Sequence, residues 1–476
     1  MSINKKIKND NFINLDYNRI KDEVRENINL KYEKNPNTSF HKYLKLSIVT
    51  ILVVFVGMFS ILTFSKGSNQ FLKVGAATKQ EISYQDMKEE GYIDFLNKLN
   101  IFSSKLSEEI YKNTSKEENY VISPVSIYMA LAMCVESGSD EVREEILNAL
   151  GMTYEEVYKY TKILFSSLNN ESDVPTIFGD KVQFMEIMSN SIWVDNDMEL
   201  KDEGLLELAN NYNCSSYSAP FGRNNKRANR AIKDYVKKQT KGLIDKDYNI
   251  SKETLFTLVN TYYLKDVWNK DGDDLPFTKD MYLFNDIVET YLLQGYYEDG
   301  KPYVAEKYTS FYANTNHSIS IKFIVPNEGY NIKDIYSKEV LYNINSIKDY
   351  DSVDEENKIK YFTRCFFPEF EASYDDDIQN ILQTGFNIEK FFTLGKNLTN
   401  ITDEDIMCGA VHHSTKLKVD KKGIEGASAV VIPMAGSPGP EEYKEVFLDY
   451  IVDKSFIVLI TDSYDVPLFS GVIYNI

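Results

Sequence analysis

Apolar residues recur at helical spacing in the first part of the chain that follows residue 90. The pattern predicts helices over residues 92–111, 124–138, 140–150 and 230–240. Ser123 followed by Pro124 is typical of a hydroxyl cap with proline in the first turn. We expect Asp140 to cap the third helix and Gly151 to end it.

Continuous apolar runs replace this spacing further along the chain. Residues 254–264 and 318–326 are rich in β-branched and aromatic side chains, which predicts buried strands. The last 30 residues hold two more predicted strands, FIVLITD and PLFSGVIYNI, joined by a tight turn. Helices dominate early and strands late, so the expected class is α+β.

Length and charge limit the organisation and the partners. The chain has 476 residues, 43% hydrophobic and 13% aromatic, which supports a large core. Its formal net charge is −19 and no long basic run offsets it, which argues against nucleic acid as a partner. We expect a cytoplasmic tail over 1–42, a membrane anchor over 43–66, a linker over 67–85 and one domain over 86–476.

The anchor prediction depends on residues 47–64, which are 18 positions without a charge, about the minimum for a helix that spans a bilayer. Ten Lys and Arg precede this run and few follow it, so the N-terminus is expected inside and the domain outside. The alternative is a signal peptide cut near Val74-Gly75-Ala76, which would release a secreted protein. The anchor is the favoured interpretation because the apolar run is long for a signal peptide.

Metal and catalytic motifs are missing from the sequence. The four cysteines, Cys134, Cys214, Cys365 and Cys408, lie far apart, and no CxxC pair occurs. Only four histidines are present, and neither a nucleophile elbow nor HExxH occurs. We therefore expect no metal, no cofactor and no enzymatic activity.

A run of small residues, VDKKGIEGASA, begins at Val419 between a predicted strand and a later apolar strand. Such a segment suits a chain that is exposed in one state and paired into a sheet in another. In a strand, alternate residues face opposite sides. One face would carry only small or apolar residues, namely Ile424, Gly426, Ser428, Val430 and Ile432, and could lie against a core.

Four segments resemble the serpins, a family of suicide protease inhibitors, and they occur in family order. Asn119–Ile127 is similar to N-x-F-x-S-P-x-S-I, and Leu258–Trp268 to L-V-N-A-x-Y-F-K-G-x-W. His413–Gly423 resembles the strand that leads into the reactive loop, and Val452–Phe456 with the following Ile-Val-Leu-Ile resembles the segment after it.

The resemblance implies a fold with three β-sheets, eight to nine helices and an exposed reactive-centre loop. It implies an irreversible inhibitor, bacterial in type, whose cleaved loop inserts into the main sheet and distorts the bound protease. The alternative is a non-inhibitory serpin-like binding or structural surface protein. Ile424, Gly426 and Pro433 depart from what insertion favours, because Ile is bulky, Gly weakens a strand and Pro lacks a donor.

The resemblance also assigns candidate site residues. The hinge comprises Gly423, Ile424, Glu425, Gly426, Ala427, Ser428, Ala429 and Val430. The reactive bond is expected among Gly436, Ser437 and Pro438, with Met434–Ala435 as second choice. The sheet-opening cluster comprises Ser123, Ser126, Asn260, His413 and Trp268, with His412 in place of His413 if the register shifts by one. Lys421 and Glu369 reverse the charges of the family's pair at the top of the sheet, so we expect a swapped ion pair there; the alternative is two solvated charges that contribute little.

No Lys or Arg occurs between Ile424 and Tyr443, so a trypsin-like target is not expected. The small and apolar residues of the reactive loop indicate an elastase-like, subtilisin-like or papain-like protease as the target. We expect a monomer at the cell membrane, with its domain extracellular.

Overall fold

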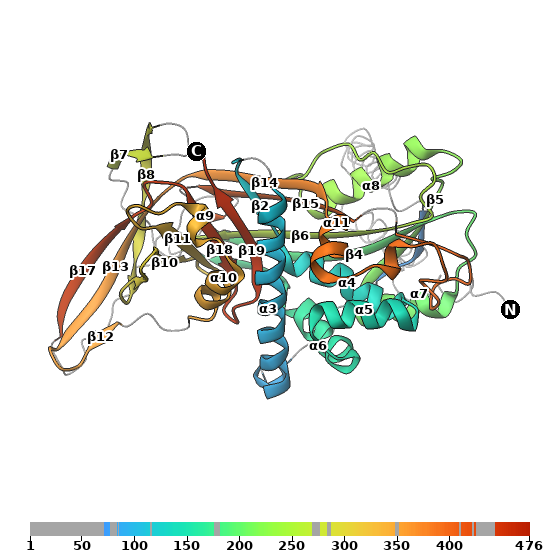
Figure 1. Ribbon diagram of the computed structural model, residues 1–476, viewed down its shortest axis with the longest axis horizontal. Helices are drawn as coiled ribbons and strands as arrows, with labels where there is room; N and C mark the ends of the chain where they lie inside the picture. The colour runs from blue at the N-terminus through green and yellow to red at the C-terminus, as the bar shows by residue number, and fades with distance from the viewer. Residues whose placement is uncertain are drawn as a thin grey trace, which may run out of the picture. The chain divides into compact units, whose positions relative to one another are not determined.

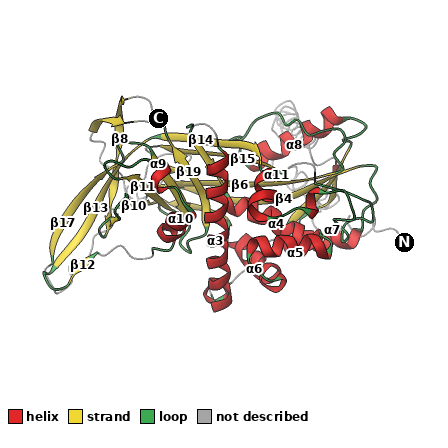
Figure 2. Cartoon of the chain, viewed as in Figure 1, coloured by secondary structure: helices red, strands yellow, loops and turns green. Residues whose placement is uncertain are grey.

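Three β-sheets with helices packed against them make up the computed structural model (Figures 1 and 2). It describes residues 71–76, 83, 85–114, 117–175, 181–268, 277–282, 287–347, 352–408, 411–420, 423–424 and 443–476. All of these residues belong to one compact unit, Gly67–Ile476.

Nine α-helices occur within the described residues. They are α3 (Glu90–Asn113), α4 (Pro124–Ser137), α5 (Asp140–Leu150), α6 (Tyr154–Ser167), α7 (Asp202–Tyr212), α8 (Asn225–Gln239), α9 (Ile332–Ile335), α10 (Lys338–Asn345) and α11 (Gln379–Phe386). Each helix expected from the apolar spacing is present, with ends shifted by a few residues.

Two expected caps differ from the observed ones. Ser139, not Asp140, caps α5, because its hydroxyl accepts from the Val142 amide. Ser123 occupies the N-cap position of α4, but its hydroxyl makes no capping hydrogen bond. Gly151 ends α5 in the left-handed conformation, as expected, at φ +66°.

The first and largest sheet has the strand order β1-β5-β4-β6-β16-β15-β14, and β3 pairs with β4. Its strands are β1 (Leu72–Val74), β3 (Asn169–Pro175), β4 (Lys181–Asp195), β5 (Cys214–Ala219), β6 (Phe256–Val267), β14 (Phe370–Asp377), β15 (His412–Asp420) and β16 (Gly423–Ile424). Helix α4 packs against β6, as does α8, and Figure 1 shows the two helices on opposite sides of the sheet.

The second sheet has the order β2-β19-β18-β11-β10-β9, and the third has β12-β13-β8-β7 with β17 beside β13. Their strands are β2 (Tyr120–Ile122), β7 (Phe277–Tyr282), β8 (Ile287–Asp299), β9 (Tyr303–Val304), β10 (Tyr308–Asn314), β11 (Ser320–Pro326), β12 (Val353–Asp354), β13 (Ile359–Pro368), β17 (Lys444–Ile451), β18 (Phe456–Thr461) and β19 (Pro467–Ile473). Both β18 and β19 are buried throughout, which accounts for their unbroken apolar sequences.

Part of the segment expected to be a linker belongs to the first sheet. β1 pairs antiparallel with β5 at the sheet edge, and Phe71 packs against a cluster that includes Trp193 and Tyr217. No helix in the part of the chain that the structure describes is both long and apolar enough to span a bilayer. The expected anchor, residues 47–64, lies outside that part.

Candidate functional site

The two central strands of the first sheet, β6 and β15, are joined through a third strand only two residues long. Gly423 and Ile424 form β16, which pairs antiparallel with both neighbours. Ile424 lies opposite Val419 of β15 and opposite Asp266 of β6. No ladder joins β6 directly to β15, although both strands are fully described. We call the region between these two strands the opening.

Gly423 is fitted to this place by its lack of a side chain. Its φ is +150°, and a Cβ atom added to it would lie 2.1 Å from the Asp266 carbonyl oxygen. Ile424 is fully buried and joins the core. The bulk of Ile424, a departure from the family pattern, is therefore accommodated where the structure places it.

Trp268, next to the end of β6, is bound to the last residue of β15. Its indole N–H donates to the Asp420 carbonyl oxygen at 2.9 Å, and its ring meets Phe367 edge to face. This hydrogen bond crosses the opening at its upper end, where the hinge enters the sheet.

Beneath the sheet, Ser123 and His413 are in contact. The Ser123 amide donates to Nε2 of His413 at 3.0 Å, and both residues are buried, whereas His412 is exposed. Burial lowers the pKa of His413 to about 3, so the ring is neutral and Nε2 is free to accept. The unpartnered Ser123 hydroxyl is also buried.

Asn260 of β6 belongs to the expected sheet-opening cluster, but its side chain binds residues of β4 instead of the other cluster members. Its amide donates to the Asn190 side chain on β4 and approaches the Met188 sulfur, on the side of β6 away from β15. Ser126 is buried one turn into α4, and its amide donates to the Ser123 carbonyl oxygen. The structure thus brings Ser123, Ser126 and His413 together, and it places no hydrogen bond between them and Asn260.

The remaining candidate residues lie largely outside the described residues. Glu369 is exposed between β13 and β14, and its neighbour Phe370 pairs with Val419. Its expected partner Lys421 is outside, as are Glu425–Val430 of the hinge and Met434–Pro438 around the reactive bond.

Two residues at the site were not predicted from the sequence. Asp266, fully buried on β6, binds His317 from the turn between β10 and β11. Thr415 of β15 donates its hydroxyl hydrogen to the Val121 carbonyl oxygen on β2. The available signal was an aspartate at the end of an apolar strand, where a buried charge requires a partner.

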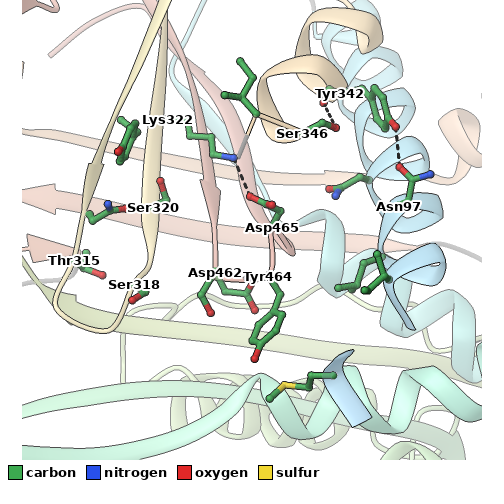
Figure 3. Close-up of a pocket in the computed structure, with 18 of the residues that line it drawn as sticks. Asn97, Thr315, Ser318, Ser320, Lys322, Tyr342, Ser346, Asp462, Tyr464 and Asp465 are labelled. Carbon is green, nitrogen blue, oxygen red and sulfur yellow. Dashed lines mark hydrogen bonds and ion pairs between the residues drawn. The ribbon is translucent and has the colours of Figure 1, made fainter. Parts of the chain in front are cut away.

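Two neighbouring hollows share Asp462 and Tyr464 in their lining. One, of about 710 Å³, lies between α3, α10 and the second sheet and is drawn in Figure 3. There the buried Lys322 ammonium reaches Asp465 at 3.2 Å and the Asn345 carbonyl oxygen at 3.0 Å, and burial lowers the pKa of this lysine. No group of three His, Cys, Asp or Glu suited to a metal occurs among the residues described.

Three β-sheets, with a two-residue strand paired between the two central strands of the largest one, define the fold class of this protein. The chain belongs to the serpin family: the model of that family, described as serpin (serine protease inhibitor), matches residues 97–476. Serpins are protease inhibitors and not enzymes themselves, which confirms that the chain is not an enzyme.

Several relatives and solved structures are similar to this chain. An alpha-1-antitrypsin-like protein of Ictidomys tridecemlineatus is 25% identical over 380 residues, which cover 77% of this chain and 85% of the relative. An uncharacterized serpin-like protein of Methanosarcina acetivorans is 22% identical over 362 residues, covering 73% and 79%.

Among solved structures, Serpin48 of the insect Tenebrio molitor matches with TM-score 0.67 at 18% identity, covering 83% of this chain and all of that one. The thermophilic serpin Tengpin in its native state matches with TM-score 0.64 at 20% identity, covering 85% and 98%. These likenesses confirm the expected fold of three sheets and eight to nine helices, and nine α-helices lie within the described residues.

Replacing Gly423 by Ala should expel β16 from the sheet, because its Cβ would collide with the Asp266 carbonyl oxygen. We expect amide exchange at Ile424, measured by mass spectrometry, to accelerate at least tenfold. Gly222→Ala is the matched control, since a Cβ there meets nothing closer than 3.8 Å. Unchanged exchange in the Gly423 variant would mean that the close approach to β6 is not maintained in solution.

Acid should destabilise the protein through His413. The unfolded ring binds a proton near pH 6.5 and the folded ring only near pH 3, so the unfolded state binds more protons between these values. Stability is therefore lost as pH falls below 6.5. His413→Gln keeps an acceptor for the Ser123 amide without titrating. Between pH 7.5 and 5 we expect the parent to lose about 2 kcal/mol more than this variant in urea unfolding; equal losses would contradict the neutral buried ring.

Proposed function

We propose that this chain is an irreversible suicide inhibitor of extracellular serine or cysteine proteases. The observation that carries the proposal is β16, in which the first two hinge residues already pair with β6 and β15. After cleavage, residues from Glu425 onward extend this strand down the opening. The acyl-linked protease travels with the loop, and its active site is distorted.

The energy for this step comes from strand addition. Each new ladder hydrogen bond contributes about 1 kcal/mol net, so a dozen supply roughly 10 kcal/mol before apolar burial is counted. The alternation of side chains between the two faces of the hinge supports this extension of β16. Ile424 faces the core, and Gly426, Ser428 and Val430 follow it on the same side of a continued strand.

The residues of the reactive loop determine which protease is inhibited. Because no Lys or Arg occurs between Ile424 and Tyr443, the protease is elastase-like, subtilisin-like or papain-like. Cleavage falls at Gly436–Ser437 or Ser437–Pro438, with Met434–Ala435 as second choice. Lys421 and Glu369 pair at the top of the sheet, where the neighbouring residues Phe370 and Val419 are already opposite each other.

Residues 47–64 anchor the protein in the membrane of a bacterial-type cell, with the inhibitor domain outside. The support is the uncharged 18-residue run and the basic residues before it. Release of the full-length chain from membranes by alkaline carbonate, without detergent, would contradict the anchor.

The second candidate is a non-inhibitory binding protein. One solved structure similar to this chain, with TM-score 0.64 at 20% identity, is a thyroxine-binding globulin in complex with thyroxine. The proline at position 433 favours this candidate, because it removes one ladder donor late in the loop.

A matched pair of hinge variants separates the two candidates. Ser428→Arg places a charge on the inward face of the inserting strand, whereas Ala429→Arg places it on the outward face. After incubation with elastase, subtilisin and papain, the parent and Ala429→Arg should form an SDS-stable complex with a target. Ser428→Arg should be cut without forming one. If no protease yields a complex with the parent, the inhibitor proposal is wrong for those classes.

Melting of the nicked protein gives an independent measurement. Roughly 10 kcal/mol gained on insertion should raise the melting temperature by about 20 °C at about 2 °C per kcal/mol. A nicked parent that melts with the intact one would support the binding protein instead.

A further inference from the structure

Asp266 is a fully buried carboxylate beside the hinge. It lies directly opposite Ile424 in the ladder between β6 and β16. Directly opposed residues share one face of a sheet, so the Asp266 side chain is next to that of Ile424 on the core side. The family segment that this strand resembles carries glycine at this place, so the charge is a feature of this chain.

The carboxylate is held by His317, in the turn between β10 and β11. The His317 amide donates to Oδ2 at 3.0 Å, and ring Nδ1 lies 2.8 Å from Oδ1. Oδ1 also accepts from the Val267 amide at 2.9 Å. The imidazole stacks on Phe184 of β4, with ring centroids 4.3 Å apart, and its Nε2 lies 3.5 Å from the Ser172 hydroxyl.

The same turn holds the end of β6 through its backbone. The Asn316 amide donates to the Val267 carbonyl oxygen at 2.8 Å, and Thr315 forms a β-bridge with Trp268. The end of β6 is therefore fixed by this turn on one edge and pairs with β16 on the other. We call the contacts of residues 315–317 with residues 266–268 the clasp.

Two more acids face the region behind the clasp, from other elements. Glu186 of β4 is buried; burial, and then the charges of Asp462 and Asp266, raise its pKa to about 8, and it accepts from the Tyr262 hydroxyl at 2.7 Å. Asp462, after β18, has its pKa raised by burial to about 6. Glu186, Asp462 and His317 line one cavity of about 1000 Å³, and Lys322 is the cation that acts on Asp462.

We propose that Asp266 and His317 are positioning residues for loop insertion: their contact fixes the end of β6 in the place where Gly423 and Ile424 pair with it. The inference rests on the proposed inhibitory function for its consequence, but it concerns the uncut molecule. Without the His317 ring, the buried Asp266 carboxylate loses its side-chain donor and keeps only the backbone amides of His317 and Val267. An underpaired buried carboxylate is costly, so it turns toward water and displaces the backbone with which β16 pairs.

Trp268 reports on the hinge, because its indole N–H binds the Asp420 carbonyl oxygen beside β16. The chain has only two tryptophans, so Trp193→Phe leaves Trp268 as the single indole. In that background we expect Trp268 emission and the amide exchange of residues 423–424 to change together when the clasp is altered by substitution.

Substitutions at the clasp then test the side-chain hydrogen bond to Asp266. His317→Asn keeps a donor at the place of Nδ1, so the hinge should stay seated and exchange should match that of the parent. His317→Ala removes that donor and should unseat the hinge, with exchange at least tenfold faster. If exchange in His317→Ala equals that of the parent, or if His317→Asn exchanges as fast as His317→Ala, the proposal is overturned.

Control variants exclude the neighbouring acids. Glu186→Gln and Asp462→Asn should each leave the exchange of residues 423–424 at the rate of the parent. A tenfold acceleration in either, with none in His317→Ala, would assign the control of hinge seating elsewhere and overturn the proposal. If Trp193→Phe does not fold, exchange in the parent gives the same answer without any tryptophan substitution. None of these readouts requires a protease, so they can fail or succeed independently of inhibition.

Discussion

The spacing of β6 and β15 is the constraint on which the rest of the molecule depends. At the upper end of the opening the two strands are far enough apart to admit a third backbone, and β16 pairs with both. The fit is close enough that a single Cβ at Gly423 would meet the Asp266 carbonyl oxygen at 2.1 Å. Whether the first hinge residues fit between β6 and β15 therefore depends first on the main-chain geometry and only then on the side chains.

The polar contacts around the opening are arranged so that few of them cross it. Asn260 binds Asn190, which belongs to β4 on its own side, and His413 accepts from Ser123, at the start of α4. Among the described contacts, Trp268 with Asp420 crosses the opening at the upper end, and Lys246, in the segment after α8, pairs with Asp375 of β14. Parting the strands therefore breaks few of the described side-chain hydrogen bonds.

The sequence was most informative where burial alone determines structure. The apolar runs of β6, β18 and β19, and the helical spacing of α3 to α5, predicted these elements because each must bury a face. The α5 cap was missed because Ser139 and Asp140 are both good caps and only backbone geometry decides between them. The residues next to Asn260 in the sequence do not indicate that its side chain binds Asn190. This contact depends on the register between β4 and β6, and the two asparagines are 70 positions apart in the sequence. Strand β1 was predicted to be linker because three residues at a sheet edge are too few to show a period.

The ionisable groups Asp266 and His317, beside the place where β16 pairs with β6, have a structural use that apolar residues would not have. An apolar residue in place of Asp266 would pack against Ile424 without needing a hydrogen-bond partner. Apolar contacts are not directional, so they would hold the end of β6 almost equally well in several slightly different positions. A buried carboxylate is stable only where its donors are, so the His317 amide and ring fix one position of the strand. Directional bonds thus fix the position of β6 beside β16, and the buried Ile424 side chain contributes apolar stabilisation at the same place.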